Sequence, residues 1–291
     1  MAEGDKEIHG GWWLNMRYFR LWKVFLTNCL IREMGFRANF ILGILGNLLS
    51  FSINILFFGI IYLNVQSIGG WDVYRTLILV STCQIINLLY SALFGGIANL
   101  TDYVKGGSLD FILLKPLDPQ LLISLRYVNL QSFLSLAFPC ATIVYVAHLG
   151  KIAISFSNLL LYIFLLLCGL LLRYALGFII MASSLWVVRI DALYALYNYI
   201  ASLAQYPMSI YKGGVRILFT FVIPIIVIAN FPALSLKVSY RQGLSFYPSS
   251  SPSFSFPFPA IYFFSVFATI QVPVAENLFE TIANTKRRGL C

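Results

Sequence analysis

The sequence contains four long stretches that are almost free of charge, and each is long enough to cross a membrane as a helix. Such a helix needs about 20 consecutive apolar residues, because it rises about 1.5 Å per residue through the hydrocarbon core. The four stretches are residues 39–63, 73–97, 121–147 and 158–188. They predict a polytopic membrane protein, and the alternative is a soluble protein with a very apolar core.

The composition favours the membrane interpretation. Of the 291 residues, 59% are hydrophobic and 11% are charged, whereas soluble domains carry about 25% charged residues. The net charge of +9 would suggest nucleic acid as a partner of a soluble protein. Here the basic residues lie beside apolar stretches, as in membrane proteins that follow the positive-inside rule. We therefore expect a lipid bilayer as the surroundings and no nucleic acid as a partner.

The later apolar segments are shorter or interrupted by proline. Residues 192–211 are aromatic and amphipathic, and residues 217–236 contain Pro224 and Pro232, which suits a broken or re-entrant helix. Residues 260–275 form a marginal last span. The fold class is therefore predicted as an all-α bundle of about six transmembrane helices, with residues 39–275 as the transmembrane domain.

The N-terminal segment, residues 1–38, contains an amphipathic stretch. Over residues 12–34, basic residues recur every three residues between aromatic and aliphatic ones, at Arg17, Arg20 and Lys23. This pattern predicts an interfacial helix that lies along the membrane surface. A soluble amphipathic helix packed on a core is the alternative.

The distribution of basic residues predicts the orientation. If the N-terminus, the loop 98–126, the turn 189–191 and the tail 276–291 are cytoplasmic, that side holds 13 of the 20 Lys and Arg. The other side holds 6, and Arg173 lies within a span. The positive-inside rule then places both termini in the cytoplasm, in a multi-pass protein of the cytoplasmic (inner) membrane.

Charges, glycines and prolines are concentrated between the second and third spans, in VKGGSLDFILLKPLDPQ, residues 104–120. Ser108 is suited to cap a short helix there, and Pro116 to end it. Leu109, Ile112 and Leu113 share one helical face, with Asp110 off it. The segment predicts a small rigid knob that contacts a partner, and the alternative is an interfacial loop without one.

The same segment resembles the cytosolic loop of ABC-2-type transporter permeases, where a G-x-L-D-x-x-L-L-K-P pattern precedes the third span. VIPIIVIANFPA and FPALSL, near residues 222–236, resemble a later stretch of that family, and the resemblance covers residues 12–236. It implies the membrane subunit of an ABC exporter, which pairs with a second copy or a related permease. It also implies a separate ABC ATPase, docked on the interfacial helix and on the loop.

By this resemblance, residues 98–120 form a coupling loop. The residues expected to couple it to the ATPase are Leu109, Asp110, Ile112, Leu113, Lys115 and Pro116. The chain has no G-x-x-x-x-G-K-[ST] motif, so ATP is expected on the partner subunit and no cofactor on this chain. The five Cys form no CxxC pair and the two His lie far apart, so no catalytic or metal site is predicted.

One basic residue, Arg173, lies near the middle of the fourth stretch. A charge at that depth is costly and indicates a functional site by default. Arg173, Gln84 and Asn87 are therefore candidates for a translocation path. The alternative is that they bond other groups within the bundle.

Two other functions compete with the exporter. A secondary transporter would usually show intramembrane carboxylates or inverted repeats, and a lipid-modifying membrane enzyme would need paired acids or a His/Asp pair at helix ends. Residues 237–291 depart from the permease pattern because they are rich in Ser, Pro and Phe. Either a shifted reading frame or a lineage-specific ending would account for them.

Overall fold

In the computed structural model, the residues described are 23–114, 119–150, 152, 154–183 and 191–236. Within these ranges the chain is helical, and its extended pairing is limited to one isolated bridge between Ile68 and Trp71. Four helical stretches are long and apolar enough to cross a membrane: Arg37–Asn64, Val73–Lys105, Leu130–Leu149 and Phe156–Ala182. The all-α membrane bundle is thus confirmed.

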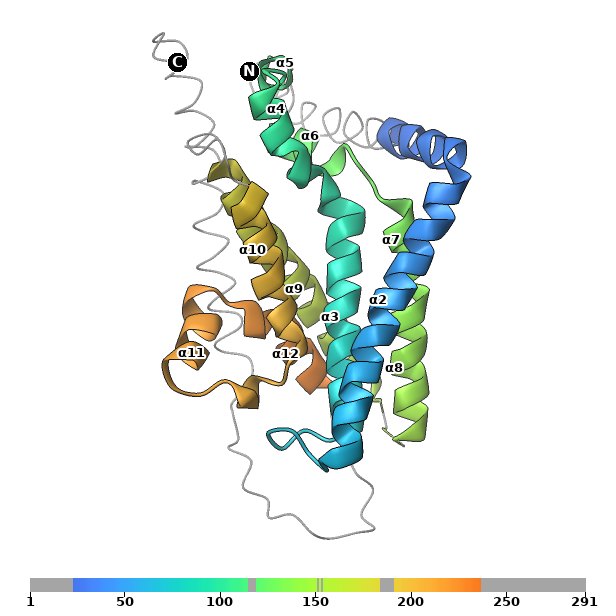
Figure 1. The fold of residues 1–291 in the computed structure, drawn as a ribbon, viewed down its shortest axis with the longest axis vertical. Coiled ribbons are helices and arrows are strands. Elements are labelled where there is room, and N and C mark those ends of the chain that lie inside the picture. The colour runs from blue at the N-terminus through green and yellow to red at the C-terminus, as the bar shows by residue number, and fades with distance from the viewer. Residues whose placement is uncertain (1–22, 115–118, 151, 153, 184–190, 237–291) are drawn as a thin grey trace, which may run out of the picture.

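Consecutive long helices run in opposite directions (Figure 1). They are α2 (Arg37–Asn64), α3 (Val73–Phe94), the pair α7 (Leu130–Ser135) and α8 (Ala137–Leu149), and α9 (Phe156–Ala182). A 3₁₀ segment, Gly95–Asn99, continues α3 into α4 (Leu100–Lys105), which α5 (Leu109–Leu113) and α6 (Pro119–Leu125) follow. These three short helices and the helical residues 23–35 lie at one end of the bundle, the α5 end (Figure 1).

The last described segment folds as a broken helix. After α10 (Asp191–Ser202), the chain passes through short 3₁₀ turns to α11 (Gly213–Ile217), which lies near the opposite end, the α11 end (Figure 1). A short π-helical segment, Leu218–Val222, leads to α12 (Ile225–Ser235). The stretches Gly213–Thr220 and Ile225–Ser235 meet at an angle of 84°. This bend agrees with the prediction from Pro224, which precedes α12 and has no N–H for a helical hydrogen bond.

The described residues therefore hold four spans, or five if the bent pair is counted as one. The predicted number of about six is not reached within them, and the predicted last span, residues 260–275, lies outside the described residues. The residues of α10, Asp191–Ser202, form a helix of 12 residues, which is shorter than the roughly 20 residues that a straight span needs.

The third span begins later than the sequence predicted. We expected it from residue 121, but α6 ends at Leu125 and α7 begins at Leu130. In the break, the Asn129 side chain accepts a hydrogen bond from the Ser132 N–H over 3.1 Å and so caps α7. The Asn129 N–H donates to the carbonyl of Ala92 on α3 over 3.0 Å, which fixes the start of the span against its neighbour.

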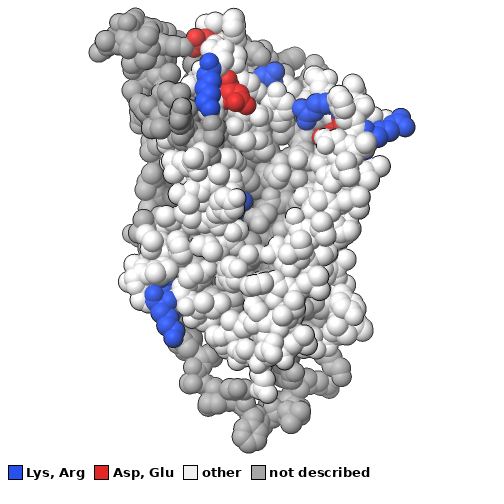
Figure 2. Space-filling model, in the orientation of Figure 1, with Lys and Arg blue, Asp and Glu red and all other residues white. Residues whose placement is uncertain are grey.

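Helix α3 is the centre of the bundle, whereas α2 has one face that no described residue covers. Apolar residues of α3 pack with α8, α9 and α12 in one cluster. Gly169 of α9 allows close contact with α12, because a Cβ at that position would collide with the carbonyl oxygen of Ile228. Charged side chains gather mostly at the α5 end and leave a broad uncharged band along the bundle (Figure 2), as expected for a surface in contact with lipid.

Candidate functional site

The predicted knob is built from α4 and α5, which continue the line of α3 beyond the bundle (Figure 1). The Gly106 N–H donates to the Asp102 carbonyl over 2.8 Å and ends α4. Gly107 follows with a φ of +66°, a conformation that glycine adopts without strain. Ser108 takes the N-cap position of α5, as predicted, but its side chain makes no capping hydrogen bond.

The two sides of α5 differ sharply in exposure. Leu109 is 6% exposed and Ile112 is 3% exposed, and both belong to a core cluster with residues of α6 and α9. Phe111 is 71% exposed and Leu114 is 80% exposed. The predicted partner-facing residues Leu109 and Ile112 therefore anchor the knob to this chain. The apolar surface that it offers consists of Phe111 and Leu114, which the sequence analysis did not select.

The other predicted coupling residues are placed only in part. Asp110 is half-buried near the start of α5. Leu113 is the last residue of α5, and the structure does not describe its side chain. Lys115 and Pro116 lie outside the described residues.

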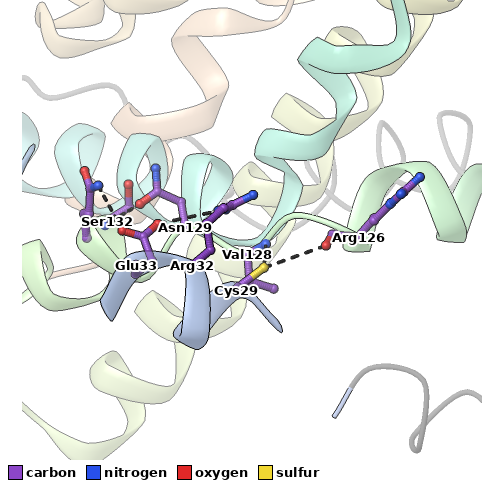
Figure 3. Close-up of polar contacts among 8 residues, drawn as sticks. Cys29, Arg32, Glu33, Arg126, Val128, Asn129 and Ser132 are labelled. Carbon is purple, nitrogen blue, oxygen red and sulfur yellow. Dashed lines mark hydrogen bonds and ion pairs between the residues drawn. The ribbon is translucent and has the colours of Figure 1, made fainter. Parts of the chain in front are cut away.

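The interfacial helix is described from Lys23 onward, and it packs on the break between α6 and α7 (Figure 3). Cys29 is buried, and its Sγ lies 3.4 Å from the Val128 N–H, from which it accepts a hydrogen bond. The same thiol donates to the Arg126 carbonyl over 3.8 Å. One turn later, Glu33 Oε2 accepts a hydrogen bond from Gln131 Nε2 over 3.1 Å. These contacts fix residues 23–35 to the start of the third span.

Of the three basic residues predicted for this helix, Lys23 is exposed, and Arg17 and Arg20 lie outside the described residues. Sequence analysis missed Cys29 and Glu33, although their i, i+4 spacing places them on one helical face.

Cationic and aromatic side chains connect the interfacial helix with α4. The Arg32 guanidinium lies 5.3 Å from the centre of the Tyr127 ring, and the Arg126 guanidinium lies 5.6 Å from the same ring. Arg126 also lies 5.8 Å from the centre of the Tyr103 ring on α4. A cavity of about 540 Å³ opens beside these groups, and Glu33 and Asp102 are among its lining residues. The three distances between a guanidinium and a ring centre are all within the range of a cation–π interaction.

The candidate path residue Arg173 is 7% exposed and lies on α9. Its guanidinium carbon is 5.0 Å from the centre of the Tyr90 ring on α3. Its Nε has no hydrogen-bond partner among the described residues. The Tyr197 hydroxyl of α10 donates to the backbone carbonyl of Arg173 over 2.8 Å. Arg173 thus lies where α3, α9 and α10 meet.

The other two candidates lie on α3 and differ in their relation to Arg173. Asn87 Oδ1 is buried without a partner among the described residues, and Asn87 Nδ2 lies 3.8 Å from Cys83 Sγ. Residues 83, 87 and 90 share one face of α3, and Tyr90 on that face has its ring against the Arg173 guanidinium. Asn87 therefore lies on the α3 face that is turned to Arg173. Gln84 is half-buried, and no contact among the described residues joins it to Arg173.

Comparison with known proteins identifies a family but no individual relative. The model of a family described as "ABC-2 family transporter protein" matches residues 48–250, which is more than two thirds of the chain. No curated protein and no solved structure matches significantly. The match begins within α2 and includes the rest of that helix, the other three spans, the knob and the bent pair of helices. The chain is therefore a membrane component of transport, and it belongs to the ABC-2 family of transporter proteins.

Proposed function

We propose that this chain is the permease subunit of an ABC exporter, driven by ATP that a separate ATPase subunit hydrolyses. Membership of the ABC-2 family supports this proposal. The sequence has no nucleotide-binding P-loop of its own, so ATP binds to the partner and this chain carries no cofactor. The proposal places the α5 end in the cytoplasm and the chain in the inner membrane, with a second copy or a related permease beside it.

The observation that carries the proposal is the form of the knob. Leu109 and Ile112 hold α5 firmly on the bundle, while Phe111 and Leu114 present large apolar side chains to the outside. Exposed apolar side chains beyond the apolar band of a membrane protein indicate a protein contact. The knob is also nearly continuous with α3, so that a push on Phe111 and Leu114 acts on the central helix of the bundle.

A second connection supports coupling through the interfacial helix. Tyr103 on α4, Arg126 and Tyr127 in the break, and Arg32 on the interfacial helix form a continuous series of cation–π contacts. An ATPase that closes on ATP would move the knob and the interfacial helix together. Such a rigid-body movement shifts the bundle from one conformation to another only if the ATPase makes different contacts with the two conformations.

The test is a pull-down of the full-length chain from its native membranes in mild detergent, assayed for ATPase activity and for P-loop proteins. The test variant combines Phe111→Asp with Leu114→Asp. The matched control combines Phe156→Asp with Leu63→Asp, since these residues are similarly exposed and lie on the side of the α11 end. We expect wild type and control to retain the ATPase and the test variant to lose it.

If all three proteins are folded and none retains an ATPase, the proposed coupling is wrong. A secondary transporter or a lipid-modifying enzyme then becomes the better interpretation. If the test variant retains the ATPase as well as wild type does, the exporter stands but the knob is not its docking surface.

A further inference from the structure

Arg173 is a buried cation without a counter-charge at the same depth among the described residues. It lies nine residues before the end of α9 at Ala182, which is about 13 Å along the helix axis. Among the described residues, ion pairs occur only near the two ends of the bundle, as Arg32–Glu33 and Arg75–Asp72. An arginine keeps its charge at any physiological pH, so Arg173 cannot lower its cost by losing a proton.

The described spans carry no carboxylate at this depth. Residues 119–190 and 192–275 contain no Asp or Glu, and neither do residues 37–71 and 73–101. Every acidic side chain of the chain therefore belongs to the N-terminal segment, to a connecting segment or helix end, or to the last 16 residues. No carboxylate among the described residues therefore neutralises Arg173 at mid-bundle, which makes an anionic ligand a candidate for its counter-charge.

The groups around Arg173 are suited to an oxyanion. Tyr90 lies beneath the guanidinium, and its hydroxyl is 3.2 Å from the hydroxyl of Tyr194. Asn87 lies on the same face of α3, and its Nδ2 carries two N–H donors, of which one is directed to Cys83 Sγ. Guanidinium, phenol and amide groups are all hydrogen-bond donors. Charge-assisted hydrogen bonds from arginine to phosphate or carboxylate are among the strongest that proteins make.

The surroundings of this group of donors are apolar. Leu172 and Ala175, which lie next to Arg173 along α9, are buried, and the large exposed side chains of this helix, among them Leu167 and Leu171, are apolar. Figure 2 shows a hollow about halfway along the bundle on the face in view, with a basic side chain visible in it. A ligand that places an anionic group here must keep the rest of its structure in apolar surroundings.

We propose that Arg173, with Asn87 and Tyr90, binds the anionic head group of an amphipathic molecule, with a phosphate monoester or a carboxylate as the charged group. One part of this inference rests on the proposed function, namely that the bound molecule is the transported substrate. The binding itself requires neither ATP nor the ATPase. A binding measurement on the permease alone therefore tests the site, whereas retention of the ATPase tests the proposed function.

The experiment measures thermal unfolding of the purified full-length chain in a neutral detergent. The probes are decyl phosphate, decyltrimethylammonium and inorganic phosphate. Decyl phosphate is expected to raise the unfolding midpoint by at least about 2 °C at saturation, and decyltrimethylammonium is expected not to raise it. Arg173→Gln should weaken the apparent affinity for decyl phosphate about tenfold or more. Arg216→Gln, which removes an exposed arginine on α11, is the matched control and should respond like wild type.

A second variant guards against loss of folding in Arg173→Gln. Asn87→Asp places a carboxylate on the α3 face turned to Arg173, so it should abolish the shift caused by decyl phosphate while the chain stays folded. Arg173→Met keeps the side-chain volume and removes the charge. If the charge awaits a ligand, this variant should unfold at the same temperature as wild type or higher when no ligand is present.

Three results would overturn the inference. The first is an equal decyl phosphate shift in wild type and Arg173→Gln, and the second is no shift in a cooperatively unfolding wild type. The third is a much lower unfolding temperature for Arg173→Met without ligand, which would mean that the chain already satisfies the charge. An equal shift with inorganic phosphate would support the anion site and would overturn the amphipathic ligand in favour of a soluble anion.

Discussion

Asn230 of α12 joins the broken helix to the turn before it, because its side chain accepts a hydrogen bond from the Met208 N–H over 2.9 Å. The same side chain donates to the carbonyl oxygens of Ala204 and Tyr206, over 3.2 Å and 3.3 Å. Asn230 is completely buried. One amide group thus satisfies three backbone groups of the segment that connects α10 with α11.

We predict that Asn230→Leu destabilises the protein by about 3 kcal/mol, because each buried backbone group left without a partner costs about 1–3 kcal/mol. The measurement is thermal or denaturant unfolding in detergent, together with the rate of limited proteolysis near residues 203–212. Asn54→Leu is the matched control, since its side chain donates only to Ser50 of the same helix. If the two variants unfold alike, Asn230 does not hold the connection.

The contact between α9 and α12 predicts a difference between two glycines. Gly169→Ala would place its Cβ against the Ile228 carbonyl, and we expect a loss of about 1–3 kcal/mol from overpacking. Gly46→Ala on α2 has open space around its Cβ, so we expect it to be neutral or to stabilise the helix by up to about 1 kcal/mol. Unfolding midpoints of the two variants check the prediction, which an equal or smaller effect at Gly169 would contradict.

The two sides of α5 lead to a third prediction. Leu109→Ala and Ile112→Ala should each destabilise the protein by about 2–5 kcal/mol, because they remove side chains from a packed core cluster. Phe111→Ala and Leu114→Ala should change stability by less than about 0.5 kcal/mol, since their side chains lie on the surface. Unfolding of the isolated permease separates the two pairs, and similar losses in all four variants would show that α5 is buried on both sides.

The sequence predicted the spans and the bend correctly but selected the wrong face of α5, and this difference has a physical reason. The charge-free stretches and Pro224 predicted the spans and the bend, because a bilayer and a missing N–H constrain a helix locally. The segment LDFILL has two apolar pairs at i, i+3 spacing, Leu109 with Ile112 and Phe111 with Leu114. Its helix of five residues is too short for periodicity to indicate which pair is buried. That depends on α6 and α9, which contact it from elsewhere in the sequence.

The predicted start of the third span was wrong for a related reason. Hydropathy alone does not show that Asn129 caps α7 or that its N–H is bonded to α3. The role of Asn230 was also not visible, since its partners lie 22 to 26 residues away along the chain. A local sequence pattern indicates whether a segment is suited to lipid or to water. The hydrogen bonds of Asn129 and Asn230 depend instead on backbone groups of other segments, which a local pattern does not contain.

The last prediction concerns the attachment of the interfacial helix. Cys29 is 4% exposed, so a thiol reagent reaches it only when residues 23–35 separate from the break between α6 and α7. Glu33→Ala removes the hydrogen bond from Gln131, which contributes about 1.5–3 kcal/mol when one partner is charged. We therefore expect alkylation of Cys29 to become about 10–150 times faster, in proportion to the population of the separated state.

Mass spectrometry of the alkylated peptides gives the rate for each cysteine in the same sample. Cys83 is equally buried but lies on α3 in the bundle, so its rate should stay unchanged in Glu33→Ala. Thr27→Ala is the control on the same helix, because Thr27 is exposed and bonds only to the Lys23 carbonyl. A parallel increase at Cys29 and Cys83 would mean that Glu33 stabilises the whole bundle. An increase confined to Cys29 means that Glu33 holds the interfacial helix at the α5 end.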